Sequence, residues 1–354
     1  MAPVPKLTES RQLAGIYRHL RTMPRFISQL LNPQPVFLNA DTIEFDVGES
    51  GTGMAPFVRS NAPGIPTRGS GSVTKRYRPA YIKMRDGINV ADNQPMWYIG
   101  ERVPWNKLSY QQKFNLTRAD IIRRHSEMKE VREEWMNSQL LRSASYNVKF
   151  QGNSGQVEDT YPIDFGRDPA LTVTPATLWS AAGAKPVEDL EGWFQTIADI
   201  YEGNITDVVM GKDVPRTLVL QEQMNNMDSA NSRILAQNFD TARLTYTDQD
   251  AVREYGTYRG VRYTSYTGRY HDATGARQYF IAPNELVVIA RKQIIGTSLM
   301  LRGRIRDIAT LDQNIDLFQK EWEVEDPSGI TILSQASPLA ATVDANFALR
   351  ATVL

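Results

Sequence analysis

The alternation of polar and apolar positions is most regular between Ser109 and Arg142, a stretch without Gly or Pro, the residues that most readily break a helix. Its apolar residues recur about every seventh position, which predicts a helix. They are Phe114, Ile121, Met128 and Trp135, with Ile122, Val131, Met136 and Leu140 beside them. A helix over 109–142 is roughly 50 Å long at 1.5 Å per residue. Two capping signals compete for its start, Ser109 with Gln112 and Thr117 with Asp120.

The other face of this helix is crowded with charged side chains, including Glu133 and Glu134. This pattern is typical of a solvated helix lying on a sheet. A coiled coil is disfavoured because the seam positions Thr117, Arg124 and Ser138 are polar.

Residues 1–42 have the pattern of a docking arm. Two short apolar helix faces follow each other, separated by Pro24 and ended by Pro33 and Pro35. A targeting peptide is the alternative, but Glu9 and the second apolar face favour docking. The two faces consist of Leu13, Ile16, Tyr17 and Leu20, and then Phe26, Ile27, Leu30 and Leu31.

Residues 43–92 predict a long two-stranded ribbon. Apolar and polar residues alternate from Ile43 to Val47, Asn61–Ser72 is a turn-rich tip, and Val73 to Val90 returns as the second strand. A ribbon with so few apolar residues is at best marginally stable alone in water. We therefore expect it to lie on a partner subunit.

The ribbon is also basic, with no acidic residue between Gly51 and Arg85. Two interpretations stay open besides solvated charge: contact with phosphate, and charge pairing with acidic residues of another copy. The second is favoured because the whole chain is neutral and the ribbon lacks an aromatic stacking platform. The basic residues are Arg59, Arg68, Lys75, Arg76, Arg78, Lys83 and Arg85, and the candidate acidic partners are Glu321, Glu323, Glu325 and Asp326.

Short strands and helices are predicted beyond the long helix. Strand-like alternation begins at Tyr146, Val187–Tyr201 has helical spacing, and Asp207–Met210 has the pattern of a buried strand. The aromatic residues between Tyr255 and Phe280 have strand spacing, and a half-buried sheet is favoured over a binding platform. Within this region, a hairpin turn is predicted at Asp272–Gly275, and a short strand follows at Leu286–Ala290.

The C-terminal stretch from Trp322 to Leu354 predicts further strands, separated by turns at Asp326–Gly329 and Asp344–Asn346. We expect this sheet to pack against the apolar stripe of the long helix.

The amino-acid composition excludes several classes of function. The 354 residues carry 40 basic and 40 acidic side chains, so a basic field over the whole molecule is absent. Without cysteine, thiolate catalysis and disulfides are excluded. No apolar run approaches the ~20 residues of a membrane span.

No catalytic, cofactor or metal motif stands out. The three histidines, His19, His125 and His271, are not spaced as ligands, and each is interpreted as a surface residue. The acidic pairs Glu133–Glu134 and Glu188–Asp189 lie on predicted helix faces, where solvation is expected. The sequence therefore favours a structural protein without a cofactor over an enzyme.

Several local motifs occur in a characteristic order. Arg68–Val90 (RGSGSVTKRYRPAYIKMRDGINV), Tyr161–Trp179, Phe280–Asn284 (FIAPN) and Ile332–Leu339 (ILSQASPL) are similar to consecutive segments of the phage lambda major head protein family. The chain thus resembles the major capsid proteins of tailed bacteriophages with the Hong Kong 97-type fold, from about Phe26 to Leu354.

This resemblance implies an α+β fold in five parts. They are an N-terminal arm (1–40), an extended β-hairpin or E-loop (41–93), a peripheral or P-domain with the spine helix 109–142 (94–185), a mixed α/β axial or A-domain (186–294), and C-terminal strands of the P-domain (295–354).

The resemblance also implies a function: pentamers and hexamers of the chain would form an icosahedral shell around double-stranded DNA. Expected partners are other copies, a separate scaffolding protein, a portal, a decoration protein and non-specifically bound DNA, without a membrane. The expected location is the virion, after assembly in the host cytoplasm.

Two alternatives remain. An encapsulin-like nanocompartment shares the fold and would hold protein cargo instead of DNA. A soluble enzyme with a Tyr-rich pocket would be a monomer or small oligomer.

Overall fold

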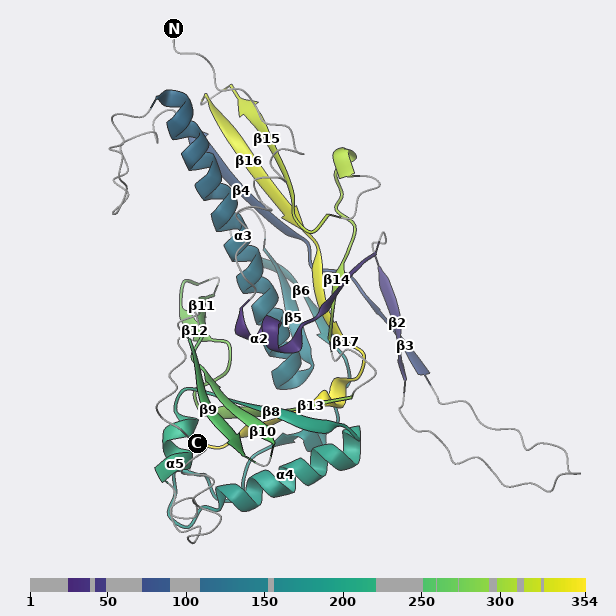
Figure 1. Ribbon diagram of the computed structural model, residues 1–354. Helices are drawn as coiled ribbons and strands as arrows, with labels where there is room; N and C mark the ends of the chain where they lie inside the picture. The colour runs from purple at the N-terminus through teal and green to yellow at the C-terminus, as the bar shows by residue number, and fades with distance from the viewer. Residues whose placement is uncertain are drawn as a thin grey trace, which may run out of the picture.

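The computed structural model describes residues 25–38, 42–48, 72–89, 109–151, 156–220, 251–258, 260–272, 274–292, 298–310, 315–325 and 328–354. The molecule is elongated, with one long helix running along its upper half and a sheet with shorter helices at its lower end (Figure 1). A two-stranded ribbon projects from one side.

The long helix is α3 (Tyr110–Ser143), and its start is decided by the first of the two capping signals. The Ser109 hydroxyl accepts a hydrogen bond from the Gln112 amide at 3.3 Å, and the Ser109 amide donates to the Gln112 side chain at 2.9 Å. This reciprocal pair satisfies two backbone donors that a helix start leaves unpaired. The helix ends at Ala144, which takes a left-handed conformation.

The upper part of the molecule is a sheet beside α3. It consists of β15 (Phe318–Val324), β16 (Gly329–Ala336) and β4 (Ile82–Asn89), all antiparallel. Met84 of β4 packs with Ile122 of the helix and Leu317.

The predicted single return strand Val73–Val90 is therefore divided. Its first half, β3 (Ser72–Tyr77), pairs with β2 (Ile43–Gly48) in the ribbon. Its second half is β4, which pairs with β16 of the body along its whole length. The division follows from pairing partners: all of β2 is paired with β3, so the backbone groups of β4 find their partners in β16 instead.

A second sheet lies across the middle of the molecule and packs against the last turns of α3. β1 (Gln34–Phe37) runs parallel to β14 (Ser298–Arg302), which pairs antiparallel with β17 (Pro338–Thr342). Met300, Leu301 and Leu339 share one buried cluster with Met136 and Leu140 of the helix. The predicted packing of C-terminal strands on the apolar stripe of the helix is thus confirmed for β17.

The lower end holds a six-stranded sheet in the order β7-β18-β13-β8-β10-β9. The C-terminal strand β18 lies inside this sheet beside β13, and α3 also contacts it. α4 (Pro186–Tyr201) and α5 (Val214–Leu220) accompany the sheet (Figure 1). The strands are β7 (Thr172–Val173), β18 (Ala348–Thr352), β13 (Glu285–Arg291), β8 (Asn204–Met210), β10 (Val261–Tyr266) and β9 (Val252–Tyr258).

The aromatic residues of this region are mostly core. Tyr263, Tyr266 and Phe280 are buried, which supports the sheet interpretation over a binding platform. β11 (Arg269–His271) and β12 (Arg277–Tyr279) form the predicted hairpin, whose turn is closed by a hydrogen bond from the Gly275 amide to the Asp272 carbonyl at 3.0 Å.

A separate hairpin, β5 (Ser145–Gln151) and β6 (Val157–Asp164), follows directly on α3. The remaining short elements are α2 (Phe26–Leu31) and the 3-10 turns η2 (Pro169–Leu171), η3 (Ile308–Thr310) and η4 (Ala345–Phe347). None of the helices in the described part of the chain is long and apolar enough to cross a bilayer.

Candidate assembly surface

The ribbon β2–β3 is rooted in the body by two cross-strand partners, Ile43 and Tyr77, which are both buried. The Tyr77 ring lies 5.3 Å from the ring of Phe165, and its hydroxyl donates to the Asp164 carbonyl. Burial, together with the nearby charge of Asp164, raises the pKa of Tyr77, so its hydroxyl remains a donor. A further hydrogen bond of 3.2 Å joins the Tyr161 hydroxyl to the Arg76 carbonyl.

One step beyond this root, the described side chains of the ribbon are solvated. Arg76 and Glu44 face each other across the two strands and form an ion pair of 2.7 Å, with 72% and 50% of their side chains exposed. An exposed pair of this kind contributes little to stability. Figure 1 shows the ribbon leaving the body at this point.

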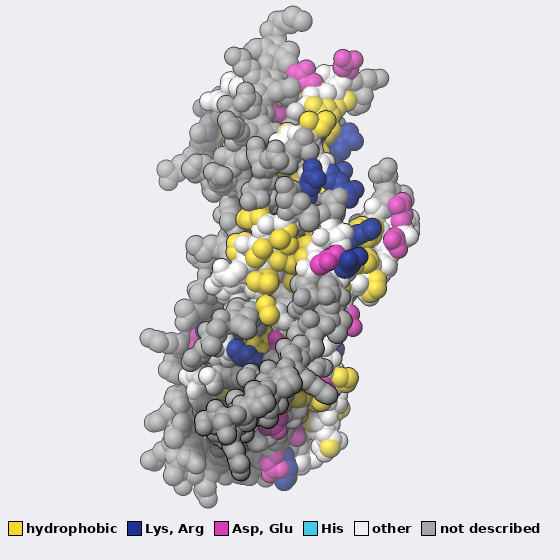
Figure 2. Space-filling view, turned by 90° about the vertical axis from the view of Figure 1, so that its right-hand side faces the viewer, with side chains coloured by type: hydrophobic (Ala, Val, Ile, Leu, Met, Phe, Trp, Pro, Cys, Tyr) yellow, Lys and Arg dark blue, Asp and Glu magenta, His cyan; other side chains and the backbone are white. Residues whose placement is uncertain are grey.

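The other basic residues predicted to act together are spread over different elements. Arg78 is exposed in the link between β3 and β4, whereas Lys83 and Arg85 are exposed on β4 of the body. Arg85 lies 5.9 Å from the ring of Trp322 on β15. Figure 2 shows Lys and Arg side chains beside hydrophobic and acidic ones on the side from which the ribbon projects.

The remaining three basic residues fall at the limit of the described chain or outside it. Lys75 lies on β3, but its side chain is not among those described. Arg59 and Arg68 lie outside the described residues.

The four acidic residues predicted as partners are not equivalent. Glu321 is enclosed by its own chain, with none of its side chain exposed, and pairs with Arg118 of α3 at 3.2 Å. Glu323 and Glu325 are exposed on and just after β15, and Asp326 lies outside the described residues. Of the three predicted acidic partners that the structure describes, Glu323 and Glu325 are therefore open to another molecule.

The face of α3 expected to be solvated is partly buried. Lys129 is 2% exposed and lies 2.6 Å from Asp316 and 3.1 Å from Glu133. Arg302 of β14 pairs with the same two acids, at 2.8 Å from Asp316. This cluster fastens the helix to β14 and to the segment before β15, so the interpretation of a solvated charged face is wrong at these positions.

His125 was expected at the surface, but it is 1% exposed. Its Nδ1 lies 2.8 Å from the Ser334 hydroxyl of β16, and its Nε2 lies 3.0 Å from the Asp86 carboxylate of β4. Burial lowers the pKa of His125 below its ordinary value, although the neighbouring Asp86 opposes this. The correction has a tertiary cause: β4 and β16 cover the polar side of the helix.

Glu134, also expected to be solvated, is fully buried and joins three parts of the molecule. It accepts hydrogen bonds from the Ile27 and Ser28 amides at 2.8 and 2.9 Å, from the Ser28 hydroxyl at 2.7 Å, and from the Tyr266 hydroxyl at 2.9 Å. Burial raises the pKa of Glu134, and these hydrogen bonds partly oppose the shift. The carboxylate thus holds the first amides of α2, where a helix favours negative charge.

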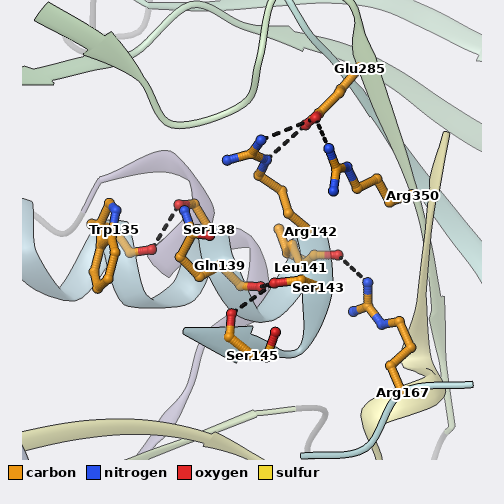
Figure 3. A network of polar contacts seen from close by, with 10 residues as sticks. All are labelled: Trp135, Ser138, Gln139, Leu141, Arg142, Ser143, Ser145, Arg167, Glu285 and Arg350. Carbon is orange, nitrogen blue, oxygen red and sulfur yellow. Dashed lines mark hydrogen bonds and ion pairs between the residues drawn. The ribbon is translucent and has the colours of Figure 1, made fainter. Parts of the chain in front are cut away.

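The C-terminal end of α3 is held by arginines (Figure 3). Arg167 donates to the carbonyls of Leu140 and Leu141 at 2.7 and 3.0 Å and to that of Ala345 at 3.2 Å. Burial, with the nearby charge of Arg350, lowers the pKa of Arg167 to about 9. A cation on the last carbonyls complements the negative end of the helix dipole.

In the same network Arg142 and Arg350 both bind Glu285 of the lower sheet (Figure 3). Arg142 makes two hydrogen bonds to the carboxylate, at 2.7 and 3.1 Å. Burial alone would raise the pKa of Glu285, but the two arginines outweigh it and lower the pKa. The spine helix and the six-stranded sheet are therefore joined by paired charges.

No group of three or more His, Asp or Glu side chains is placed to hold a metal ion among the residues the structure describes. The buried ionisable residues His125, Lys129 and Glu134 of α3 are each paired within the chain, an arrangement that stabilises a rigid subunit. The projecting ribbon and the exposed residues around its root are open to an outside partner.

The sequence matches the family model of phage major capsid protein E over residues 9–353. No curated protein sequence matches it.

Three solved structures with similar folds have names that refer to phages or prophages. A putative capsid protein of a prophage from E. coli CFT073 aligns with a TM-score of 0.69 and 16% identity, covering 99% of this chain and 100% of that one. The mature capsid of bacteriophage PhiM1 aligns with a TM-score of 0.51 and 10% identity, over 94% and 87% of the two chains. A phage-related protein from Bordetella bronchiseptica RB50 aligns with a TM-score of 0.50 and 8% identity, over 99% and 98%.

Proposed function

Since this chain belongs to the phage major capsid protein E family and forms the capsid shell of a tailed bacteriophage, we propose that it assembles as pentamers and hexamers. These close into an icosahedral head around double-stranded DNA. The protein is a structural one, located in the capsid of the virion. Its Hong Kong 97-type fold carries the ribbon, the spine helix and the two groups of strands that a shell subunit needs.

The observation that supports this proposal most is the ribbon β2–β3. It leaves the body after a buried root at Ile43 and Tyr77, and its next pair, Glu44 and Arg76, is solvated. Two strands without a covered face gain too little from burial to be stable alone. Laying the ribbon on another copy supplies the missing cover, and one such contact per subunit is repeated around the shell, which multiplies its effect.

The proposed division of the chain keeps the five parts expected from the sequence. The pairing of strands suggests that two of these parts each contribute a strand to a neighbouring sheet. The E-loop (41–93) includes β4 at its base, where it enters the upper sheet. The C-terminal part (295–354) crosses from the P-domain into the lower sheet through β18.

The exposed basic residues Arg76 and Arg78 at the ribbon, together with Arg59 and Arg68 of its tip segment, contact a neighbouring copy in this proposal. Glu323 and Glu325 are candidate receivers, while Glu321 is used inside its own chain. Further partners are a scaffolding protein, a portal, a decoration protein and the enclosed DNA. Assembly takes place in the host cytoplasm.

The proposal is tested by shortening the ribbon. Replacing residues 51–71 with a short Gly-Ser turn leaves β2 and β3 in place and removes the tip. We expect a folded, soluble subunit that forms no closed shells, because the cover between copies is lost. Electron microscopy of the purified product shows whether closed shells form, and circular dichroism shows whether the subunit is folded.

A matched control is a substitution that keeps the length of this segment, such as Gly69→Ala. Closed shells of ordinary size from the shortened chain would contradict the role of the ribbon. A parent chain that forms no shells at all would contradict the proposed mode of assembly itself.

A further inference from the structure

The upper sheet β15-β16-β4 has one face on α3 and a second face that points away from the helix. Side chains alternate between the two faces along a strand. Ser334 of β16 reaches His125 of the helix, so its neighbour Leu333 lies on the second face. The cross-strand register places Arg85 of β4 beside Leu333 there. We call this second face the outer face, and it includes Lys83, Arg85, Leu333, Lys320, Trp322 and Val324.

The outer face is only partly covered by its own chain. Lys83 and Arg85 are exposed, and Leu333 and Trp322 are half-buried, whereas Ile332 on the face toward α3 is fully buried. Figure 2 shows Lys and Arg side chains beside hydrophobic ones above the ribbon on this side of the molecule. Large apolar side chains on an open sheet face, bordered by charged ones, are typical of a surface that another molecule covers.

The charge of the outer face is positive. None of the ion pairs between residues that the structure describes involves Lys83 or Arg85, whereas Lys320 is paired with Asp307 at 2.5 Å. The Arg85 guanidinium lies 5.9 Å from the ring centroid of Trp322. Arg and Trp are the side chains that most often dominate the binding energy of a protein interface. The outer face therefore offers cations and an aromatic ring side by side.

Further cations adjoin the outer face at the end near the ribbon. Gly303 lies against Pro79, so close that an added Cβ would come within 2.6 Å of the proline ring. Arg78 and Arg304 come directly before and after these two residues, and both are exposed. The outer face thus continues into a positively charged margin.

This charge selects the kind of occupant. A second copy of the same face would bring like charges together, and residues 51–85 of the ribbon segment contain no acid either. A DNA duplex lying along the cations would meet the exposed carboxylates of Glu323 and Glu325, on and just after β15. A polypeptide with acidic residues beside apolar ones fits both parts of the face, because its apolar side chains cover Trp322 and Leu333 while its carboxylates meet the cations.

We propose that the outer face of β15-β16-β4 is the docking surface for an acidic, partly apolar segment of a second, different protein. Lys83 and Arg85 pair with the carboxylates of that segment, and Trp322 and Leu333 pack against its apolar side chains. The inference rests on the proposed function and deepens it, since it gives the shell subunit a place where an accessory protein attaches.

A charge reversal in the full-length chain tests the proposal. The probe is a short fluorescein-labelled peptide of glutamate with interspersed leucine, and fluorescence anisotropy at low salt measures its binding. We expect Lys83→Glu/Arg85→Glu to bind the peptide about tenfold more weakly than the parent chain, because like charges replace opposite ones. The neutral variant Lys83→Gln/Arg85→Gln disturbs the strand less and should bind with intermediate affinity. Thermal unfolding verifies that each variant is folded.

The control Lys149→Glu/Lys212→Glu makes the same change in charge at exposed lysines of β5 and of the segment after β8, and it should bind the peptide like the parent chain. A parent chain that does not bind the peptide would overturn the proposal, and so would equal binding by Lys83→Glu/Arg85→Glu. A short DNA duplex that binds more tightly than the peptide, and is lost in the same variant, would identify a nucleic acid as the occupant instead.

Electron microscopy of the same proteins separates this inference from the proposed function. Closed shells from Lys83→Glu/Arg85→Glu, together with weakened peptide binding, would support an attached accessory protein. Loss of shells in this variant alone would show that the outer face joins copies of the chain, which overturns the inference and leaves the proposed function standing. A parent chain without shells would contradict the proposed function, whatever the peptide does.

Discussion

Three ionisable side chains of the spine helix, His125, Lys129 and Glu134, are almost entirely buried. Each is held by residues far away in the sequence: Ser334 is 209 residues from His125, and Ile27 is 107 residues from Glu134. Their burial is tolerated because every charge or polar atom named here meets a partner of matching kind. At the residue scale, buried polar side chains of α3 therefore hold α2, the upper sheet and the lower sheet in place.

His125 gives the stability of the subunit a dependence on pH. Its pKa is lowered in the folded state, so the unfolded chain binds more protons between that pKa and the ordinary value of about 6.5. The contribution of the neutral His125 ring to stability is fully present above about pH 6.5 and is lost as the pH falls toward the folded pKa. We expect the free energy of unfolding, measured by urea titration of unassembled subunits, to fall over this window.

The variant His125→Gln removes the titrating ring and should flatten that part of the profile. His271→Gln serves as the matched control, because His271 is exposed on β11. A slope that persists unchanged in His125→Gln would refute the assignment of this pH dependence to His125.

At the scale of elements, the ends of α3 are fixed in two different ways. Its start is closed by neighbours in sequence, Ser109 and Gln112. Its end is closed by Arg167, which comes from the segment after β6 and donates to three carbonyls. The guanidinium of Arg167 and the neighbouring Arg142–Glu285 pair thus help to hold the end of the spine helix against the lower part of the molecule.

Arg167→Lys is expected to destabilise the subunit by about 2 kcal/mol or more, because one ammonium replaces fewer of the charged hydrogen bonds and leaves buried carbonyls unpaired. Urea unfolding monitored by circular dichroism gives the change. Arg216→Lys, at an exposed position of α5, is the control and should alter stability little. Equal stabilities of the two variants would argue against the clamp.

At the scale of the whole molecule, a chain of zero net charge keeps its charges unevenly distributed. The buried charges around α3 are paired within the subunit, whereas other charged residues, such as Arg78, Lys83 and Glu323, are exposed on its surface. Assembly is therefore expected to depend on salt even though the chain as a whole is neutral.

We expect the yield of shells, followed by light scattering, to fall as sodium chloride rises from about 0.1 M to about 1 M, where the Debye length shortens from about 10 Å to about 3 Å. Thermal unfolding of unassembled subunits should change far less, since the charge pairs around α3 are buried. A yield that is constant or higher at high salt would show that apolar contacts alone drive assembly.

The local part of this architecture was predictable from sequence. The capping box at Ser109, the helix Pro186–Tyr201 and the hairpin turn at Asp272–Gly275 are set by residues only a few positions apart, so short patterns specify them. The order of the sequence motifs likewise indicated the capsid family. The solvated pair Glu44–Arg76 of the ribbon also agrees with its polar composition.

Only the tertiary structure decided which segments cover a given helix face, strand or charged side chain. Whether Glu134 is solvated, whether β4 belongs to a ribbon or to a sheet, and whether Glu321 is free for a neighbour all depend on segments that approach from distant parts of the chain. A pattern of period 3.6 or 2 marks which residues share a face, but it carries no information about what covers that face. The sequence by itself therefore determined the elements and the family, and the fold decided which charges are buried and which are left for another copy.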